Sequence, residues 1–153
     1  MNTVLKKVAE ALKKYSGKRL AIGVSGGRDS MCLLHAVLHC EGIDKDDVVV
    51  VHVNHSLRDT ADRDENFVRN HCARAHVKCI IKRVDVKRLA QSDSLTVEQA
   101  ARNLRYGVFR DLIKSGMADV VLTAHHALDN AESVLMHIFR GAGLDGGGLP
   151  QNQ

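Results

Sequence analysis

The sequence predicts an α/β protein built as a doubly wound parallel sheet with helices on both faces. Short apolar runs alternate with helical segments along the 153 residues. The connections between the apolar runs are too long for β-hairpins, and parallel strands require crossovers of this length. The composition supports one globular domain, since 44% of the residues are hydrophobic and only one is proline.

The expected elements follow one another without an internal repeat. Residues 3–15 carry apolar side chains at helical spacing and predict an opening helix, which Ser16 and Gly17 end. Apolar runs predict strands at 19–24, 47–55, 78–86 and 118–126. Helices are expected at 31–40, 60–75, 96–116 and 128–140. Thr96 and Gln99 fit a capping box at the start of the 96–116 helix.

The charge and composition of the chain indicate which classes of partner it can bind. The net charge of +4 and the pI of about 9.0 are compatible with RNA. No apolar run reaches the roughly 18 residues of a membrane span, and the N-terminus has no targeting pattern, so we expect a cytoplasmic protein without membrane contact. The cysteines form no CxxC pair and are expected to be reduced structural thiols.

Three polar clusters directly follow predicted strands. They are "SGGRDS" (25–30), "VNHSLR" (53–58) and "AHHALDNAE" (124–132). The carboxyl ends of parallel strands lie at one edge of a sheet, and ligands bind there, near the point where the strand order reverses. We therefore expect the three clusters to line one crevice.

The first cluster fits neither of the two common nucleotide-binding glycine patterns. The glycines of "IGVSGGRDS" (22–30) match neither GxxxxGK[ST] nor GxGxxG. What remains is a tight Ser-Gly-Gly turn before a helix N-terminus, which can bind an anion through backbone N–H groups. Ser25 and Ser30 add hydroxyl donors, and Asp29 could hold Mg²⁺. The alternative is a purely structural turn with Ser30 as the helix N-cap.

The complete cluster resembles the SGGxDS signature of the PP-loop ATP pyrophosphatases, which have an adenine nucleotide alpha hydrolase-like fold. In that superfamily the loop holds the departing pyrophosphate, so ATP donates AMP and no lysine is needed to promote γ-phosphoryl transfer. The resemblance implies ATP and Mg²⁺ as cofactors. It also implies that the loop residues bind the nucleotide: Ser25, Gly26, Gly27, Arg28, Asp29 and Ser30.

Further segments are similar to one branch of this superfamily, the tRNA(Ile)-lysidine synthetases. These segments are "VHVNHSLR" (51–58), "TVEQAARNLRYGVF" (96–109) and "TAHHALDNAESVLMHIFRGAGLDG" (123–146). The resemblance implies that lysine is joined to C2 of the wobble cytidine of tRNA(Ile) through an adenylated intermediate. It implies one ATP-binding domain over 1–146 and a flexible, truncated tail over 147–153, with tRNA-binding domains missing from the chain.

The acidic residues of the last cluster extend the implied site. By the resemblance, Asp29 and Asp129 would coordinate Mg²⁺, and Glu132 lies one helical turn beyond Asp129 on the same face. Either Asp129 or Glu132 could deprotonate the incoming lysine. Leu128 stands where the family has another aspartate, so of these two positions only Asp129 is assigned the family's role. The alternative is a solvated helix N-terminus, which favours acidic residues without catalysis.

Polar residues after the strands could contact the nucleotide. We expect this of Asn54, His55 and His125, and less of His126, while His52 is expected to be a core or sheet-face residue. Asn54 and His55 have a turn role as their alternative, and a buried histidine is more often structural than functional.

Arginines on the predicted helices could bind phosphate. Arg102 is assigned a catalytic role, and Arg102 and Arg105 could clamp phosphate or the tRNA backbone. The alternative is a solvated helix face with a salt bridge from Glu98 to Arg102. Arg140 could reach substrate or stabilise a helix C-terminus.

Two other functions fit part of the pattern. A PP-loop tRNA thiolase would use similar ATP chemistry, but thiolases with an iron–sulfur cluster need CxxC cysteines near the site, and this chain has none. The other is a nucleotide-binding module that is inactive without a missing C-terminal part.

Overall fold

The computed structural model describes residues 3–57, 59–126, 134–140 and 151–152. In these residues six strands form one mixed sheet in the order β3-β2-β1-β4-β5-β6. β1 to β4 are parallel, β5 pairs antiparallel with β4, and β6 pairs antiparallel with β5. The strands are β1 (Leu20–Gly23), β2 (Val48–Asn54), β3 (Lys78–Arg83), β4 (Val120–His126), β5 (Val134–Arg140) and β6 (Gln151–Asn152).

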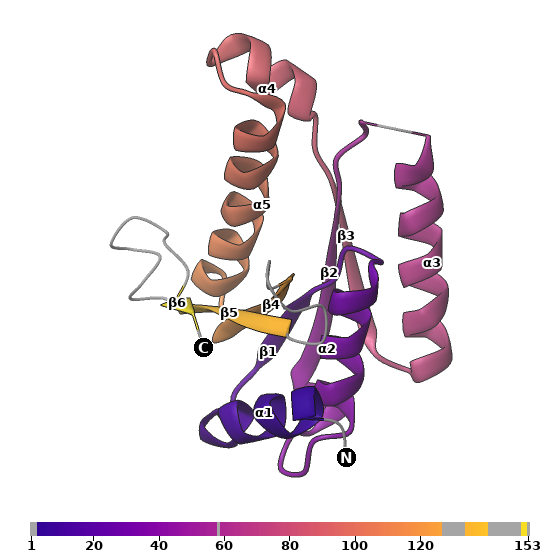
Figure 1. Cartoon of the computed structure of the whole chain (residues 1–153), viewed down its shortest axis with the longest axis vertical. Helices are drawn as coiled ribbons and strands as arrows, with labels where there is room; N and C mark the ends of the chain where they lie inside the picture. Colours follow the sequence, from indigo (N-terminus) through magenta and orange to yellow (C-terminus); the bar gives the residue numbers. More distant parts are fainter. Residues whose placement is uncertain (1–2, 58, 127–133, 141–150, 153) are drawn as a thin grey trace.

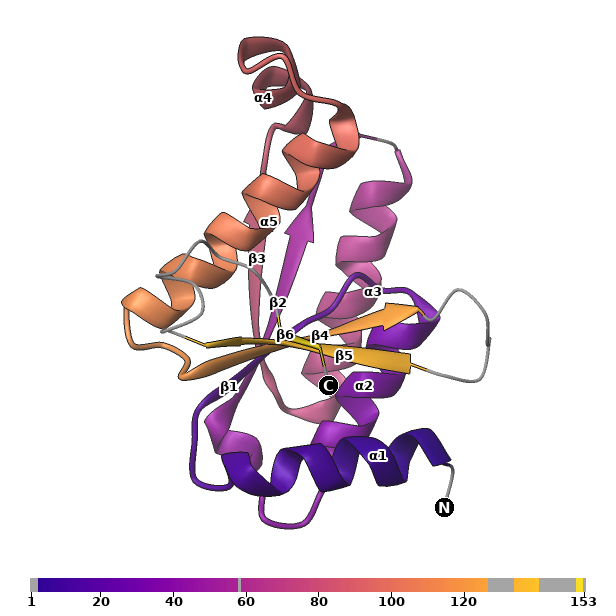
Figure 2. The same ribbon diagram turned by 60° about the vertical axis from the view of Figure 1, so that its left-hand side comes forward.

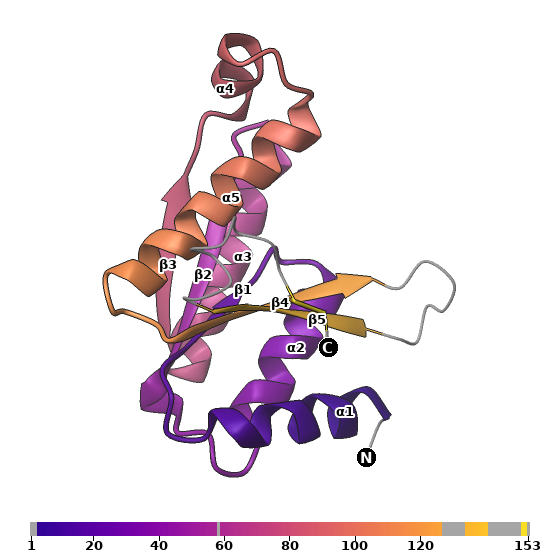
Figure 3. The ribbon, with the colours of Figure 1, turned by 90° about the vertical axis from the view of Figure 1, so that its left-hand side faces the viewer.

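Helices cover both faces of the sheet (Figure 1). α2 and α3 lie on one face with α1 packed beside α2, whereas α5 crosses the other face and α4 packs against α5 (Figure 2, Figure 3). In the described part of the chain, no helix combines the length and apolar content that a membrane span requires. The helices are α1 (Thr3–Leu12), α2 (Arg28–Leu38), α3 (Thr60–Ala75), α4 (Val86–Ser92) and α5 (Val97–Lys114), with short 3-10 turns η1 (Lys13–Tyr15) and η2 (Lys45–Asp47).

Each face of the sheet has its own core, because side chains alternate along each strand. Ile22 and Val50 pack in the cluster on the face of α1, α2 and α3. Val49 and Val51 pack in the cluster on the opposite face, against Phe109 of α5. Phe109 is fully buried, and burial of a side chain of this size stabilises the fold by about 1.5–3 kcal/mol.

The strand order places the switch point between β1 and β4. From β1 the chain passes through α2 and α3 to β2 and β3 on one side, and it returns through α4 and α5 to β4 on the other side of β1. The predicted doubly wound arrangement is therefore confirmed. Ligand sites in such sheets lie at the carboxyl ends of the strands that flank this point.

Several predicted details are confirmed by the structure. α3 has the predicted bounds, and Thr96 and Gln99 form the predicted capping box. The Gln99 N–H donates to Thr96 Oγ1 at 3.1 Å, and the Thr96 N–H donates to Gln99 Oε1 at 3.0 Å.

β3 ends at Arg83, three residues before the predicted strand end. α4 was not predicted, and the Asp85 side chain caps it by accepting from the Arg88 N–H.

The predicted helix over 128–140 is wrong in its described part. Val134–Arg140 is the strand β5, and each of its residues pairs with β4. A short apolar run can form a strand or a helix by its pattern alone, and here the edge of β4 offers backbone partners to residues with high β-propensity. Residues 128–133 lie outside the described residues. Within the predicted tail, Gln151–Asn152 pair with β5.

Candidate functional site

The glycine turn joins β1 to α2, and two hydroxyl groups hold it together from within. Gly26 has a φ of +93°, which an L side chain rarely adopts, and Gly27 is the N-cap of α2. Ser30 Oγ accepts from the Ser25 N–H at 3.1 Å and donates to the Gly27 carbonyl at 3.0 Å. Ser30 is therefore not the N-cap, and the structural alternative is wrong on this point. The start of α2 has no side-chain cap, an arrangement that favours a bound anion.

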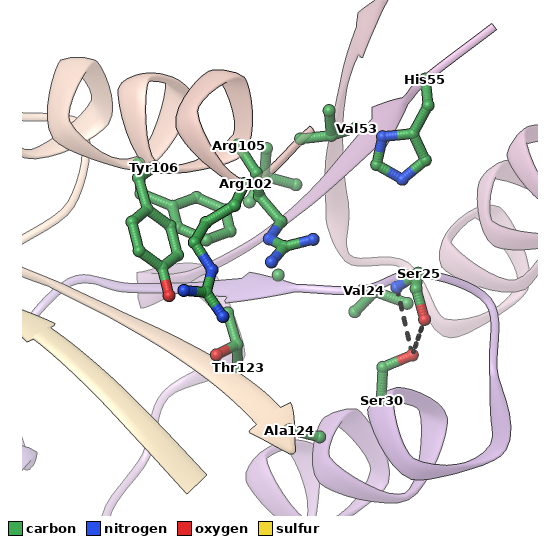
Figure 4. Close-up of a pocket in the computed structure, with 13 residues that line it drawn as sticks. Val24, Ser25, Ser30, Val53, His55, Arg102, Arg105, Tyr106, Thr123 and Ala124 are labelled. Carbon is green, nitrogen blue, oxygen red and sulfur yellow. Dashed lines mark hydrogen bonds between the residues drawn. The ribbon is translucent and has the colours of Figure 1, made fainter. Parts of the chain in front are cut away.

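A cavity of about 310 Å³ opens at the switch point. Figure 4 shows the carboxyl ends of β1 and β4 on one side of it and α5 on the other. The described parts of all three polar clusters contribute to its lining, as predicted for the crevice. The lining residues are Gly23, Val24, Ser25, Ser30, Val51, Val53, His55, Arg102, Arg105, Tyr106, Phe109, Thr123 and Ala124.

Two arginines give this cavity a positively charged wall. Arg102 and Arg105 extend from α5 into the space opposite Ser25 and Ser30 (Figure 4). Salt bridges between described residues involve neither arginine, so the alternative pair of Glu98 with Arg102 is not formed.

The environment of Arg105 is unfavourable for an uncompensated cation. Burial lowers the pKa of Arg105 below its usual value, and the positive charge of Arg102 acts in the same direction. Tyr106 offsets part of this effect, because its ring centroid lies 5.8 Å from the guanidinium carbon, a cation–π distance. Arg105 is partly buried, and Arg102 is exposed beside it. A partly buried cation without a described carboxylate partner favours an anionic ligand.

A second cavity of about 350 Å³ lies on the other side of the glycine turn, between β2 and α3. The turn contributes Ser25, Gly26 and Gly27, β2 contributes His52 and Asn54, and α3 contributes Thr60 and Asp64, among others. Both cavities include Ser25, Val53 and His55, so they adjoin along the turn.

A buried carboxylate fixes the loop between β2 and α3. Glu65 on α3 accepts from Arg83 at 2.8 and 3.1 Å, from Arg69 at 3.2 Å and from the Asn54 amide at 3.1 Å. The hydrogen bonds from Arg83 are the main cause that lowers the pKa of Glu65 to about 2. Asn54 Oδ1 accepts from the Ser56 N–H at 2.9 Å. These contacts support the turn role that was the alternative for Asn54.

The remaining predicted residues occupy different places. Arg28 is exposed and Asp29 half-buried in the first turn of α2, and neither lines the two cavities. His125 and His126 end β4 at the crevice edge, but their side chains lie outside what the structure describes. Asp129 and Glu132 lie outside the described residues. Their predicted roles stay predictions.

Arg140 is not at a helix C-terminus, and it does not line the crevice. It ends β5, paired with Val120 at the amino end of β4, and it donates to the Tyr15 hydroxyl at 2.7 Å. The crevice is at the carboxyl end of β4, so Arg140 lies at the opposite end of that strand. The error follows from the wrong helix assignment for this segment.

Residues 1–152 match one protein family, described as the PP-loop domain. The chain belongs to this family. The resemblance drawn from "SGGRDS" is thereby confirmed at the level of the family, and the glycine turn at residues 25–30 is called the PP-loop below.

The chain is similar in sequence to tRNA(Ile)-lysidine synthases from several bacteria. The enzyme of Clostridium perfringens is 36% identical over 146 residues, which cover 92% of this chain and 31% of the relative. Those of Chlorobaculum tepidum and Deinococcus radiodurans are each 38% identical, over 95% and 98% of this chain and 46% and 25% of the relatives. The chain therefore spans less than half the length of the relatives it matches.

Two solved structures share the fold. The NH3-dependent NAD synthetase from Campylobacter jejuni has a TM-score of 0.57 at 16% identity and covers 78% of this chain and 52% of its own. The U34-tRNA thiolase NcsA from Methanococcus maripaludis has a TM-score of 0.60 at 13% identity and covers 82% and 46%. These similarities confirm the predicted fold class.

Sequence reasoning missed several residues that line the PP-loop crevice. Thr123 and Tyr106 border the first cavity, and Asp64 and Thr60 border the second. Tyr106 follows Arg105 in the segment that carried the resemblance, and that adjacency was the available signal. Asp64 stands in a polar helix where nothing local separates it from its charged neighbours.

Proposed function

We propose that the crevice binds ATP, with the two outer phosphates on the PP-loop and the α-phosphate toward α5. The observation that carries the proposal is the placement of Arg102 and Arg105 opposite the PP-loop, without a described carboxylate partner (Figure 4). A triphosphate between them would neutralise both arginines and accept from backbone N–H groups at the start of α2. Membership in the PP-loop family supports a nucleotide as this anion.

The reaction we propose is that of the tRNA(Ile)-lysidine synthases among the relatives. The C2 oxygen of the wobble cytidine attacks the α-phosphorus of ATP, and the bond between the α-phosphorus and the bridging oxygen breaks to release pyrophosphate. The uncharged side-chain amine of free lysine then attacks C2. The C2–oxygen bond breaks, and AMP leaves with the electron pair.

Each step requires something that residues of this chain would supply. The first step needs the charge on the departing pyrophosphate to be neutralised, which is the role of the PP-loop, while Arg102 would stabilise the negative charge on the α-phosphate. The second step needs the lysine ammonium to lose a proton, and we assign this to Asp129 or Glu132. We place the reaction in the cytoplasm, where tRNA(Ile) and lysine are available.

Asp29 and Asp129 would hold Mg²⁺ in this proposal, and the ion would neutralise charge on the phosphates. Asp29 is half-buried in the first turn of α2, directly after the PP-loop, which suits an oxygen ligand beside bound phosphates. The described residues contain no cluster of three or more potential metal ligands. A Mg²⁺ site usually consists of one or two carboxylates together with substrate phosphates and water.

The positions of the cysteines favour lysidine formation over sulfur transfer. Cys32, Cys72 and Cys79 lie on α2, α3 and β3, Cys40 follows α2, and none of them lines either cavity. An iron–sulfur cluster needs several thiolates that converge on one site. The similarity to a thiolase therefore concerns the fold.

Nucleotide binding is tested by calorimetric titration of this chain with a non-hydrolysable ATP analogue. The variant Arg105→Met is expected to weaken binding by about 10- to 100-fold, as for a lost charge-assisted hydrogen bond. The matched control is Arg110→Met, because Arg110 is on the same helix, is also partly buried and lines neither cavity. If Arg105→Met and Arg110→Met bind the ATP analogue with equal affinity, Arg105 does not bind the nucleotide and this part of the proposal is wrong.

The reaction is tested with ATP, Mg²⁺, radiolabelled lysine and tRNA(Ile). Label in the tRNA together with AMP and pyrophosphate supports lysidine formation. ATP binding without label in the tRNA supports the alternative of a nucleotide-binding module that needs a further part of the protein. ADP and free phosphate as products would overturn the proposed chemistry altogether.

A further inference from the structure

His52 is a buried polar residue in a strand that otherwise consists of valines up to its last residue. β2 is buried along its whole length, and His52 is only 3% exposed. Alternation places His52 on the same face as Val50, which is the face of α2 and α3. A valine would satisfy the hydrophobic pattern at this position, so the imidazole requires a separate explanation. Burial of a polar ring is unfavourable unless it is hydrogen-bonded.

The imidazole bonds to the last residue before the PP-loop. His52 Nδ1 lies 2.7 Å from the Val24 carbonyl oxygen. A carbonyl oxygen only accepts, so Nδ1 carries the hydrogen and the neutral ring has Nε2 as an acceptor. His52 also lines the second cavity, beside Gly26 and Gly27.

β2 thus holds both backbone polar groups of Val24. The Val24 N–H donates to the Val51 carbonyl at 2.9 Å, and the Val24 carbonyl accepts from His52. The peptide plane between Val24 and Ser25 is therefore fixed at its carbonyl oxygen. The next peptides belong to Gly26 and Gly27, which have no side chain of their own, and the Gly27 N–H donates to Ser25 Oγ at 3.2 Å. A fixed starting plane limits the directions in which their N–H groups can point.

We propose that His52 is a positioning residue for the PP-loop: its Nδ1–H holds the Val24 carbonyl and thereby orients the backbone of the turn at Gly26 for an anion. This inference rests on the proposed function, in which that anion is the outer part of ATP. In contrast to Arg102, His52 acts through the backbone of the loop and needs no contact with the substrate.

Two substitutions separate the Nδ1 donor from the rest of the ring. The Asn side-chain nitrogen in His52→Asn can occupy the place of Nδ1 and retain the donor, whereas His52→Leu has no donor. We expect His52→Asn to bind inorganic pyrophosphate and ATP within about threefold of wild type, and His52→Leu to bind both about tenfold more weakly. Val50→Ala is the control, because Val50 is buried on the same strand face and does not line the second cavity.

The outcomes distinguish this inference from the proposed function. If wild type binds both ligands and His52→Leu binds them equally well, the positioning role is wrong. If Val50→Ala weakens binding as much as His52→Leu, the effect is general loss of stability and the role is also wrong. If wild type binds neither ligand, the proposed function fails, and the amide resonances of Gly26 and Gly27 decide the positioning role. Those resonances should shift in His52→Leu and return toward wild type in His52→Asn.

A measurement on the wild-type protein covers the case in which His52→Leu does not fold. Long-range ¹H–¹⁵N correlation spectra of ¹⁵N-labelled protein report which imidazole nitrogen carries the hydrogen. The Nδ1–H tautomer is expected for the neutral ring of His52. The Nε2–H tautomer would overturn the inference, because Nδ1 could then not donate to Val24.

Discussion

Replacing Glu65 with glutamine is expected to destabilise the protein near neutral pH. The pKa of Glu65 falls from its ordinary value of 4.5 to about 2. A decrease of this size corresponds to roughly 3 kcal/mol, at about 1.4 kcal/mol for each pKa unit. The side chains of Arg69 and Arg83 are 54% and 67% exposed, so solvent screens part of the interaction. We therefore expect Glu65→Gln to lower the free energy of unfolding by about 2 kcal/mol at pH 7.

The stabilisation by Glu65 is expected to depend on pH. A carboxyl group with a lowered pKa in the folded state contributes its full stabilisation above the pKa of the unfolded chain. For Glu65 this contribution is present above about pH 4.5 and is lost as the pH falls toward 2. The difference between wild type and Glu65→Gln should therefore be largest at pH 7 and should narrow between pH 5 and pH 3.

The assay is urea unfolding followed by far-ultraviolet circular dichroism at several pH values. Glu98→Gln is the matched control, because Glu98 is exposed on α5 and takes part in no salt bridge between described residues. It should change stability by less than about 0.5 kcal/mol at every pH. A Glu65→Gln effect that is independent of pH, or no larger than the control, would refute the reasoning.

Three further substitutions test the packing with the same unfolding assay. Gly107→Ala should stabilise α5 by about 0.5–1 kcal/mol, because an added Cβ meets nothing within 4 Å and alanine is the better helix former. A lower free energy of unfolding for this variant would contradict the prediction. Gly23→Ala should cost about 1–3 kcal/mol, since its Cβ would lie 2.8 Å from Thr123 Cγ2 and 3.0 Å from Phe109 Cζ. An unchanged midpoint of urea unfolding for Gly23→Ala would show that β1 and β4 can separate at Gly23. Thr96→Ala removes the capping box and should cost about 1 kcal/mol, and a neutral result would mean that α4 alone fixes the start of α5.

Local patterns were sufficient to predict the parallel strands β1 to β4 and the glycine turn. The valine run of β2 is apolar at every position of one face, and the start of α5 has its cap within four residues. The crevice could be predicted because parallel topology brings strand ends together wherever the strands lie in the sequence. These features depend on interactions between near neighbours or on topology alone.

Contacts between distant residues could not be predicted in the same way. The partner of His52 is the Val24 carbonyl, 28 residues away, and a backbone atom leaves no mark in the sequence. Glu65 and Arg83 are separated by 18 residues and lie among many other charged side chains. The strand β5 depends on pairing with β4, because its apolar run is compatible with either state.

The place of β1 in the middle of the sheet has a consequence for the order of folding. Leu20 pairs with Val48 on one side and with Val120 on the other, so the second pairing joins segments a hundred residues apart in the chain. Closing so long a loop is slow compared with forming β1, α2 and β2. Until β4 docks, the strand that supports the PP-loop keeps one unpaired edge, and the crevice lacks the part of its lining that Thr123 and Ala124 of β4 supply. Nucleotide affinity should therefore emerge late in refolding, after most helical signal has returned.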